Sequence, residues 1–233
     1  MSKRIWELDA LRGLCILGMV LVHLLYDLRM LGYIDRWALL TFLQNWGGML
    51  FLLISGICVT LGRHHVRRGL IVLGCGFLCT AVTAGMVFLN MADDSLTIYF
   101  GVLHCLGTCM LLWGLFSRLP TWALGLLGIC LAAVGLLVLP DVRVDFPWLI
   151  PIGLRFYGFA SSDYFPLLPN LGYFLLGACL GRVLYREKIS LLPRISTRSL
   201  PIRFLCLCGR NSLWIYLLHQ PILTGILAIP SLF

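Results

Sequence analysis

Apolar residues come in long runs along this chain, separated by short clusters of charged, proline and turn-forming residues. An apolar helix of roughly 20 residues is long enough to cross the hydrocarbon core of a bilayer. Run length and breaker residues mark seven such spans, at about 8–26, 37–61, 69–91, 96–116, 122–139, 165–185 and 204–226. The pattern therefore predicts an all-α fold, a polytopic membrane helix bundle of about seven transmembrane helices, formed as a single domain over residues 1–233.

Composition supports an integral membrane protein. The chain is 60% hydrophobic and 12% charged, with a mean hydropathy of +0.95, whereas soluble domains carry about 25% charged residues. Most of the ten cysteines lie inside the apolar runs. We expect them to act as small apolar residues at helix contacts, and we expect no metal site.

The distribution of charge gives an orientation. With a cytoplasmic N-terminus, the inner segments hold fourteen of the eighteen Lys and Arg residues, and the outer segments hold seven of the ten acids. This arrangement obeys the positive-inside rule, and the basic run Arg63–Arg68 is interpreted as one such inner loop. The net charge of +8 therefore indicates topology and contact with membrane lipid or an anionic cytosolic ligand, and not nucleic-acid binding.

The first span carries three polar residues on one face. Arg12 and His23 are eleven residues apart, or three helical turns and about 16 Å, and Asp27 follows one turn later. Ionisable residues within a membrane helix normally face a bundle interior or a water-filled path, so they mark a candidate functional site. A carboxylate beside an imidazole fixes its tautomer and makes it a suitable general base.

Two further histidines fall inside spans, His104 in the fourth and His219 in the last. Together with His23 they could meet in the middle to outer half of one cavity. The alternative is that each histidine bonds a neighbouring helix and only stabilises the bundle. Pro221 follows His219 closely and breaks the local helix, which suits either a cavity wall or simple packing.

The last span begins at the cytoplasmic face with Arg210, Asn211 and Ser212. Asn211 or Ser212 can cap the helix, and its free N–H groups with Arg210 and Arg12 form a candidate phosphate site. An ordinary cap with lipid-headgroup contacts is the alternative.

On the outer side, polar and aromatic residues occur in pairs, Asn45 with Trp46 and Asp163 with Tyr164. This mixture suits binding of a sugar or another polyol. The alternative is an interfacial belt of aromatic and turn residues.

Five blocks of sequence, in order along the chain, resemble one known family. Arg12 and His23 have the Arg-x10-His spacing of the transmembrane acyltransferase superfamily. The blocks are ELDALRGLCILGMVLVHLLYDL, LFLLISG, IYFGVLHCLG, DYFPLLPNLGYFLLGACLG and GRNSLWIYLLHQP. They are similar to the heparan-α-glucosaminide N-acetyltransferase catalytic-domain family, and the chain resembles a small bacterial-type member.

The resemblance implies an enzyme that moves an acetyl or short acyl group from cytosolic acetyl-CoA across the membrane to an extracytoplasmic sugar. Arg12 and Arg210 would hold the CoA phosphates or the pantetheine end. His23 would deprotonate the acceptor or transiently carry the acyl group, and Asp27 would orient it. His104 and His219 would line the channel and stabilise the oxyanion. A bacterial plasma membrane and an acceptor in an envelope glycan are the expected setting, with a homo-oligomer left open.

Two other classes of function remain as alternatives. Intramembrane His and Asp residues also serve proton relays, so a proton-coupled membrane transporter is one alternative. A non-catalytic membrane protein that retains affinity for CoA is the other. Paired broken helices in inverted repeats would favour a transporter, and the sequence shows none.

Overall fold

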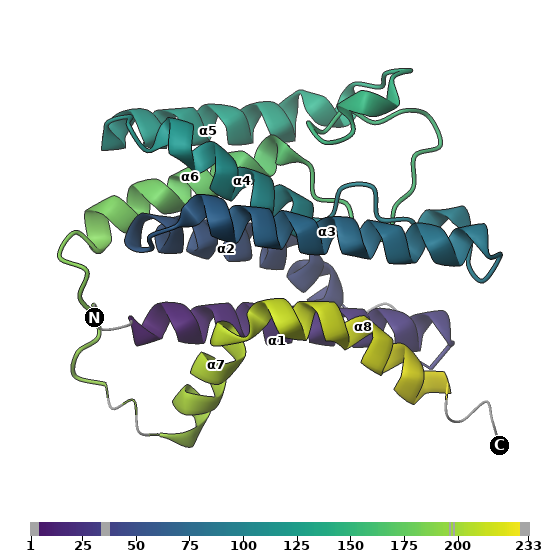
Figure 1. Ribbon diagram of the computed structural model, residues 1–233, viewed down its shortest axis with the longest axis horizontal. Helices are drawn as coiled ribbons and strands as arrows, with labels where there is room; N and C mark the ends of the chain where they lie inside the picture. Colours follow the sequence, from purple (N-terminus) through teal and green to yellow (C-terminus); the bar gives the residue numbers. More distant parts are fainter. Residues whose placement is uncertain (1–4, 34–37, 196, 198, 229–233) are drawn as a thin grey trace. The chain divides into compact units, whose positions relative to one another are not determined.

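The computed structural model describes residues 5–33, 38–195, 197 and 199–228, including the side chains of all but 38–45 and 228. The described chain is built from helices, labelled in Figure 1. It divides into two compact units, one formed by Met1–Ile54 with Glu187–Phe233 and the other by Ser55–Arg186. The helix α2, Ala38–Leu61, begins in the first unit and ends in the second.

The first unit is organised around α1, Trp6–Met30, which packs against α7, Leu200–Arg210, and α8, Ser212–Ala228. Glycines allow α1 and α7 to meet backbone to backbone. A Cβ atom on Gly13 would overlap the Leu205 carbonyl oxygen, and one on Gly209 would overlap the Asp9 carbonyl oxygen. Small residues at a helix crossing are typical of membrane bundles, where close packing replaces the hydrophobic effect.

A buried carboxylate ties the segment before α7 to the start of α1. Glu7 is only 6% exposed, and its two oxygens accept hydrogen bonds from the Ser190 hydroxyl at 2.9 Å and the Leu191 N–H at 2.7 Å. Because both oxygens are satisfied, the charge is compensated in the interior.

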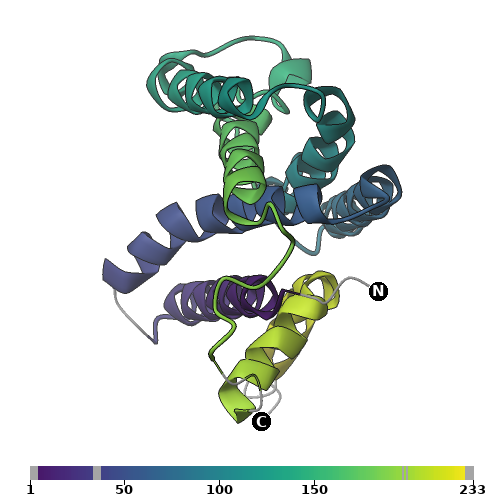
Figure 2. The ribbon, with the colours of Figure 1, turned by 90° about the vertical axis from the view of Figure 1, so that its left-hand side faces the viewer.

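The second unit is built from two helix pairs. Its long helices are α3, His65–Phe88; α4, Val102–Phe116; α5, Thr121–Leu137; and α6, Leu167–Leu184. Short 3-10 turns occur at Asp94–Leu96, Leu139–Asp141 and Pro147–Leu149. The pairs are α3 with α4 and α5 with α6, and α4 also touches α6 (Figure 2). The almost fully buried side chains of Phe174, Leu175, Leu124, Cys105 and Cys109 form the core of this unit.

Arginine secures one end of the second unit. Arg182, in the last turn of α6, donates to the Leu119 carbonyl at 2.6 Å and the Ser117 carbonyl at 2.5 Å, just beyond the C-terminus of α4. A cation is favourable there because the carbonyl groups at a helix C-terminus carry partial negative charge.

The helical class predicted from the apolar runs is confirmed. Four helices of the described chain, Trp6–Met30, His65–Phe88, Thr121–Asp141 and Leu167–Leu184, are long and apolar enough to cross a membrane. Shorter apolar helices cover Trp46–Leu61, Val102–Phe116 and Ser212–Leu227. Each predicted span therefore overlaps an apolar helix, and the number that cross the bilayer stays a prediction.

The structure differs from the sequence pattern in two of the spans. The span expected at 96–116 becomes helical only at Val102, because Gly101 is extended. The span expected at 204–226 is split at Asn211, whose backbone leaves the helical region at φ −102° and ψ 18°. Asparagine suits such a break because its side chain bonds nearby carbonyls, here that of Leu207 at 2.9 Å.

The glycine crossing gives a first prediction. Replacing Gly13 with Ala places a methyl group on the Leu205 carbonyl, so the stability of the folded protein should fall by about 1–3 kcal/mol. Gly18→Ala, in the same helix, is the matched control because no described atom lies within 4 Å of its Cβ position. Thermal unfolding in detergent should show a lower midpoint for Gly13→Ala and an unchanged or higher one for Gly18→Ala, since alanine favours helix. Equal midpoints would contradict the close crossing.

Candidate functional site

The polar residues expected in the first and last spans lie between α1 and α8. The Arg12 Nη2 donates to the Ser212 hydroxyl at 3.1 Å, and the Gln220 Nε2 donates to an Asp27 carboxylate oxygen at 3.1 Å. Between these two bonds, the rings of His23 and His219 are 4.8 Å apart. Since the partners follow the same order along both helices, α1 and α8 run parallel and share a line of polar contacts.

The two imidazoles form the centre of this line. Their ring planes are inclined at 61°, so one ring presents its edge to the other. The Nδ1 of His219 lies 2.5 Å from the Tyr216 carbonyl oxygen, which can only accept a hydrogen bond. Nδ1 therefore carries a proton, and in the neutral ring the lone pair is on Nε2. His219 is buried, whereas His23 is half-buried.

Asp27 forms a hydrogen bond with α8, and its expected role of orienting His23 stays a prediction. The sequence interpretation assigned it to orient His23, but in the described part of α1 no hydrogen bond joins these two side chains. Its carboxylate instead accepts from Gln220, which the sequence analysis did not single out. An amide within an apolar span, directly after His219 and before Pro221, was the available signal. Gln220 thus belongs to the same polar line.

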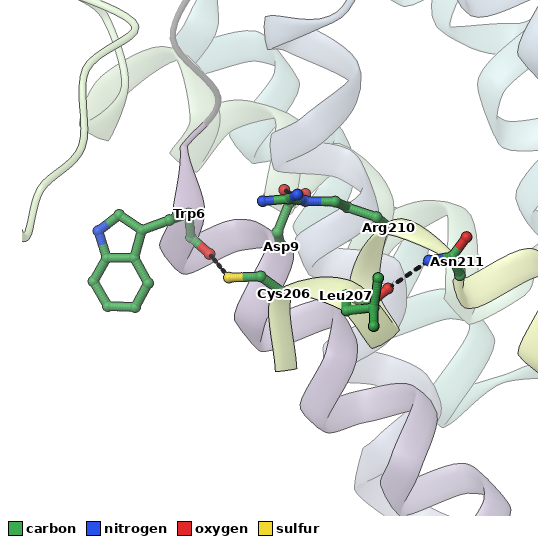
Figure 3. A network of polar contacts seen from close by, with 6 residues as sticks. All are labelled: Trp6, Asp9, Cys206, Leu207, Arg210 and Asn211. Carbon is green, nitrogen blue, oxygen red and sulfur yellow. Dashed lines mark hydrogen bonds and ion pairs between the residues drawn. The ribbon is translucent and has the colours of Figure 1, made fainter. Parts of the chain in front are cut away.

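At the other end of the line, the residues of the candidate phosphate site bond to one another. Arg12 is joined to the buried Ser212, while its Nε is buried and has no hydrogen-bond partner among the described residues. Arg210 pairs through its Nε with Asp9 of α1 at 3.1 Å, and Asn211 turns back to the Leu207 carbonyl (Figure 3). The side chain of Arg210 remains 47% exposed. Each guanidinium group is thus held by a bond that joins α1 to the junction between α7 and α8.

His104 belongs to the second unit, so a cavity shared by the three histidines stays a prediction. It is 1% exposed, and both ring nitrogens are bonded. The Gly101 N–H donates to Nδ1 at 3.2 Å, so the neutral ring carries its proton on Nε2, 3.3 Å from the Thr80 hydroxyl. That hydroxyl in turn donates to the Ile98 carbonyl at 2.6 Å. The ring therefore closes the first turn of α4 and ties it to α3.

The outer candidates Asp163 and Tyr164 precede α6. An Asp163 carboxylate oxygen accepts from the Val102 N–H at 3.1 Å, where an anion is favoured by the N-terminus of α4. The Tyr164 hydroxyl donates to the Ile150 carbonyl at 2.8 Å. Burial raises the pKa of Tyr164 to about 12, opposed by the nearby Arg155, so this hydroxyl is neutral at physiological pH. Trp46 is 49% exposed, and the side chain of Asn45 lies outside the described residues.

No group of three or more His, Cys, Asp or Glu residues within the described ranges is arranged to hold a metal ion. The groups that the site offers for chemistry include the imidazoles of His23 and His219, the Asp27 carboxylate and two guanidinium groups. An imidazole with a lone pair accepts protons or attacks carbonyl carbon, and guanidinium groups bind phosphate.

One comparison with known proteins gave a match. A family model described as "Heparan-alpha-glucosaminide N-acetyltransferase, catalytic" matches residues 4–221, nearly the whole chain. No curated protein and no solved structure matched. The chain therefore belongs to the heparan-alpha-glucosaminide N-acetyltransferase catalytic family and is an integral membrane enzyme of the acetyltransferase class.

Proposed function

We propose that this protein takes an acetyl or short acyl group from cytosolic acetyl-CoA and transfers it to an extracytoplasmic sugar or glycan. The observation that carries the proposal is the polar line between α1 and α8. In this line the His23–His219 pair is about three helical turns from Arg12, and the residues of α1 between Arg12 and His23 are apolar or glycine. Family membership supplies the reaction class, and the line supplies residues suited to it.

Arg12 and Arg210 are the proposed donor-binding residues. A guanidinium group has five N–H donors, and the bonds to Ser212 and Asp9 use one nitrogen of each. The remaining donors suit the phosphates or the amide oxygens of the pantetheine arm. Ser212 and Asn211 keep the junction between α7 and α8 in place, so they position these two guanidinium groups.

His23 is the proposed reacting imidazole, by one of two routes. In the first, it takes the proton of the acceptor hydroxyl or amine as that group attacks the thioester carbonyl, and the proton then passes to the departing CoA thiolate. In the second, its nitrogen attacks the thioester, CoA leaves as the thiol, and the acceptor displaces the acetyl group from the imidazole. In both, His219 adjoins the reacting ring, and Gln220 fixes Asp27 one turn away.

For the acceptor we propose two sets of outer residues, Asn45 and Trp46 in the first unit and Asp163 and Tyr164 in the second, each as a candidate contact in its own unit. The exposed indole of Trp46 offers an apolar face for a sugar ring. The side chains of Tyr164 and Asp163 form hydrogen bonds with backbone groups, so their positions are fixed. An envelope glycan is the proposed acceptor class.

The role of His23 predicts a separation of binding from turnover. His23→Ala should lower acetyl transfer and thioester hydrolysis by about 10²–10⁴-fold, because the base or nucleophile is lost. Affinity for CoA, measured by calorimetry on the same preparation, should stay within about twofold, since the guanidinium groups are unchanged. An acetyl label that hydroxylamine removes from the wild type, and that His23→Ala does not acquire, would select the second route. Undiminished turnover would contradict either route.

The role of Arg12 predicts weaker donor binding. Arg12→Gln should raise the Kd for CoA by roughly 10–100-fold, the worth of one or two hydrogen bonds to a charged group. Ser212→Ala keeps the guanidinium charge and should have a smaller effect. Arg186→Gln removes the same charge from an exposed position and serves as the control. If Arg186→Gln weakens binding as much as Arg12→Gln, general electrostatic attraction explains the result and the specific site is wrong.

His104 allows a test between a positioning and a reacting role. Its two bonded nitrogens predict that His104→Ala lowers the free energy of unfolding by about 1–3 kcal/mol, because Gly101 and Thr80 lose their partner in the interior. Thr80→Val alone should be destabilising, and the double variant should cost less than the sum of the two. A His104→Ala protein with an unchanged melting temperature and no turnover would show that the ring takes part in the reaction.

A further inference from the structure

The start of α3 carries an open pocket of about 770 Å³ that the proposed reaction does not use. It is lined by His64, His65, Val66, Arg67, Leu70 and Ile71. Its volume is within the usual range for small-molecule sites, about 300–1,000 Å³. The pocket lies in the loop between α2 and α3 and in the first two turns of α3, where the sequence predicts the cytoplasmic membrane surface.

The part of this pocket next to the loop between α2 and α3 is cationic. Arg67, in the first turn of α3, lines the pocket, and Arg63 lies in the loop next to the lining residue His64; both arginine side chains are exposed. Within the described residues, neither guanidinium is paired with a carboxylate. His65 is held in place because its Nδ1 donates to the Met110 carbonyl of α4 at 3.1 Å. The pocket therefore offers positive charge on a rigid base.

The part of the pocket further along α3 is apolar, and its side chains are exposed. Val66, Leu70 and Ile71 line the pocket and are 48%, 57% and 50% exposed. Ile71 lies one helical turn beyond Arg67 on the same face, about 6 Å along the axis. One turn further on, a Cβ atom added to Gly74 would meet nothing within 4 Å, so the face stays open along the helix. Along α3, the cationic side chain of Arg67 is therefore followed within one helical turn by the exposed apolar side chain of Ile71.

We propose that this pocket binds an anionic phospholipid. The phosphodiester is held by Arg63 and Arg67, and the first part of an acyl chain lies along Leu70 and Ile71. A soluble phosphate compound would use only the cationic part, whereas a phospholipid matches both parts. Basic pockets at the cytoplasmic ends of membrane helices are suited to such headgroups, at about 1 kcal/mol for each Arg near the surface.

The test uses the full-length protein in phosphatidylcholine nanodiscs and spin-labelled phosphatidylglycerol as the probe. The motionally restricted fraction of the probe gives its association constant relative to spin-labelled phosphatidylcholine. The wild type should prefer phosphatidylglycerol, and Arg63→Gln with Arg67→Gln should lower that preference by more than about tenfold, since each guanidinium contributes about fivefold. Arg118→Gln with Arg186→Gln is the matched control, because it removes two exposed guanidinium groups elsewhere in the same unit.

Three results would overturn the proposal. The Arg63/Arg67 variant could retain the wild-type preference, which would exclude this pocket. The control variant could lose as much preference as the Arg63/Arg67 variant, which would show diffuse attraction and no site. Inorganic phosphate or CoA could displace the probe as well as unlabelled phosphatidylglycerol does, which would identify a soluble phosphate ligand. A selective loss that only the lipid can compete with supports the proposal.

Discussion

Polar side chains on an apolar helix need partners, and in this protein the partners come from a second helix that runs alongside. The bonds of Arg12 to Ser212 and of Asp27 to Gln220 satisfy part of the hydrogen-bonding capacity of groups that would be costly to expose to hydrocarbon. The imidazole pair of His23 and His219 lies between them. This line depends in turn on the close approach of α1 and α7. Without the glycines at their crossing, the junction that begins α8 could not lie against α1.

The second unit shows the same chemical groups used for a different purpose. His104 and Asp163 both bond backbone N–H groups at the start of α4, and both lie far from the junction in sequence. An intramembrane histidine is therefore not by itself evidence of a reacting group. What distinguishes His219 is that its ring lies against the ring of His23, whereas His104 has both nitrogens bonded to the protein.

Much of the fold could be predicted because hydropathy and length determine where apolar helices form. The sequence offered Asn211 as a cap, but it merged α7 and α8 into one span, since residues 204–208 and 213–218 are apolar. Arg12, His23 and His219 could be singled out by charge and spacing. Gln220 was missed although an amide inside an apolar span was a signal, and its bond to Asp27 of α1 is seen only in the structure. The role of His104 depends on Gly101 and Thr80, which no spacing rule connects.

The central claim is that an imidazole between two membrane helices allows a thioester on one side to acylate an acceptor on the other. Sealed proteoliposomes with the protein in a single orientation test it most directly. Radiolabelled acetyl-CoA is added outside, to the predicted cytoplasmic face, and an amino-sugar acceptor is enclosed. The account predicts labelled acceptor inside the vesicles, formed by the wild type and not by His23→Ala. Label that appears only when donor and acceptor share the same side, or that forms equally without His23, would contradict it.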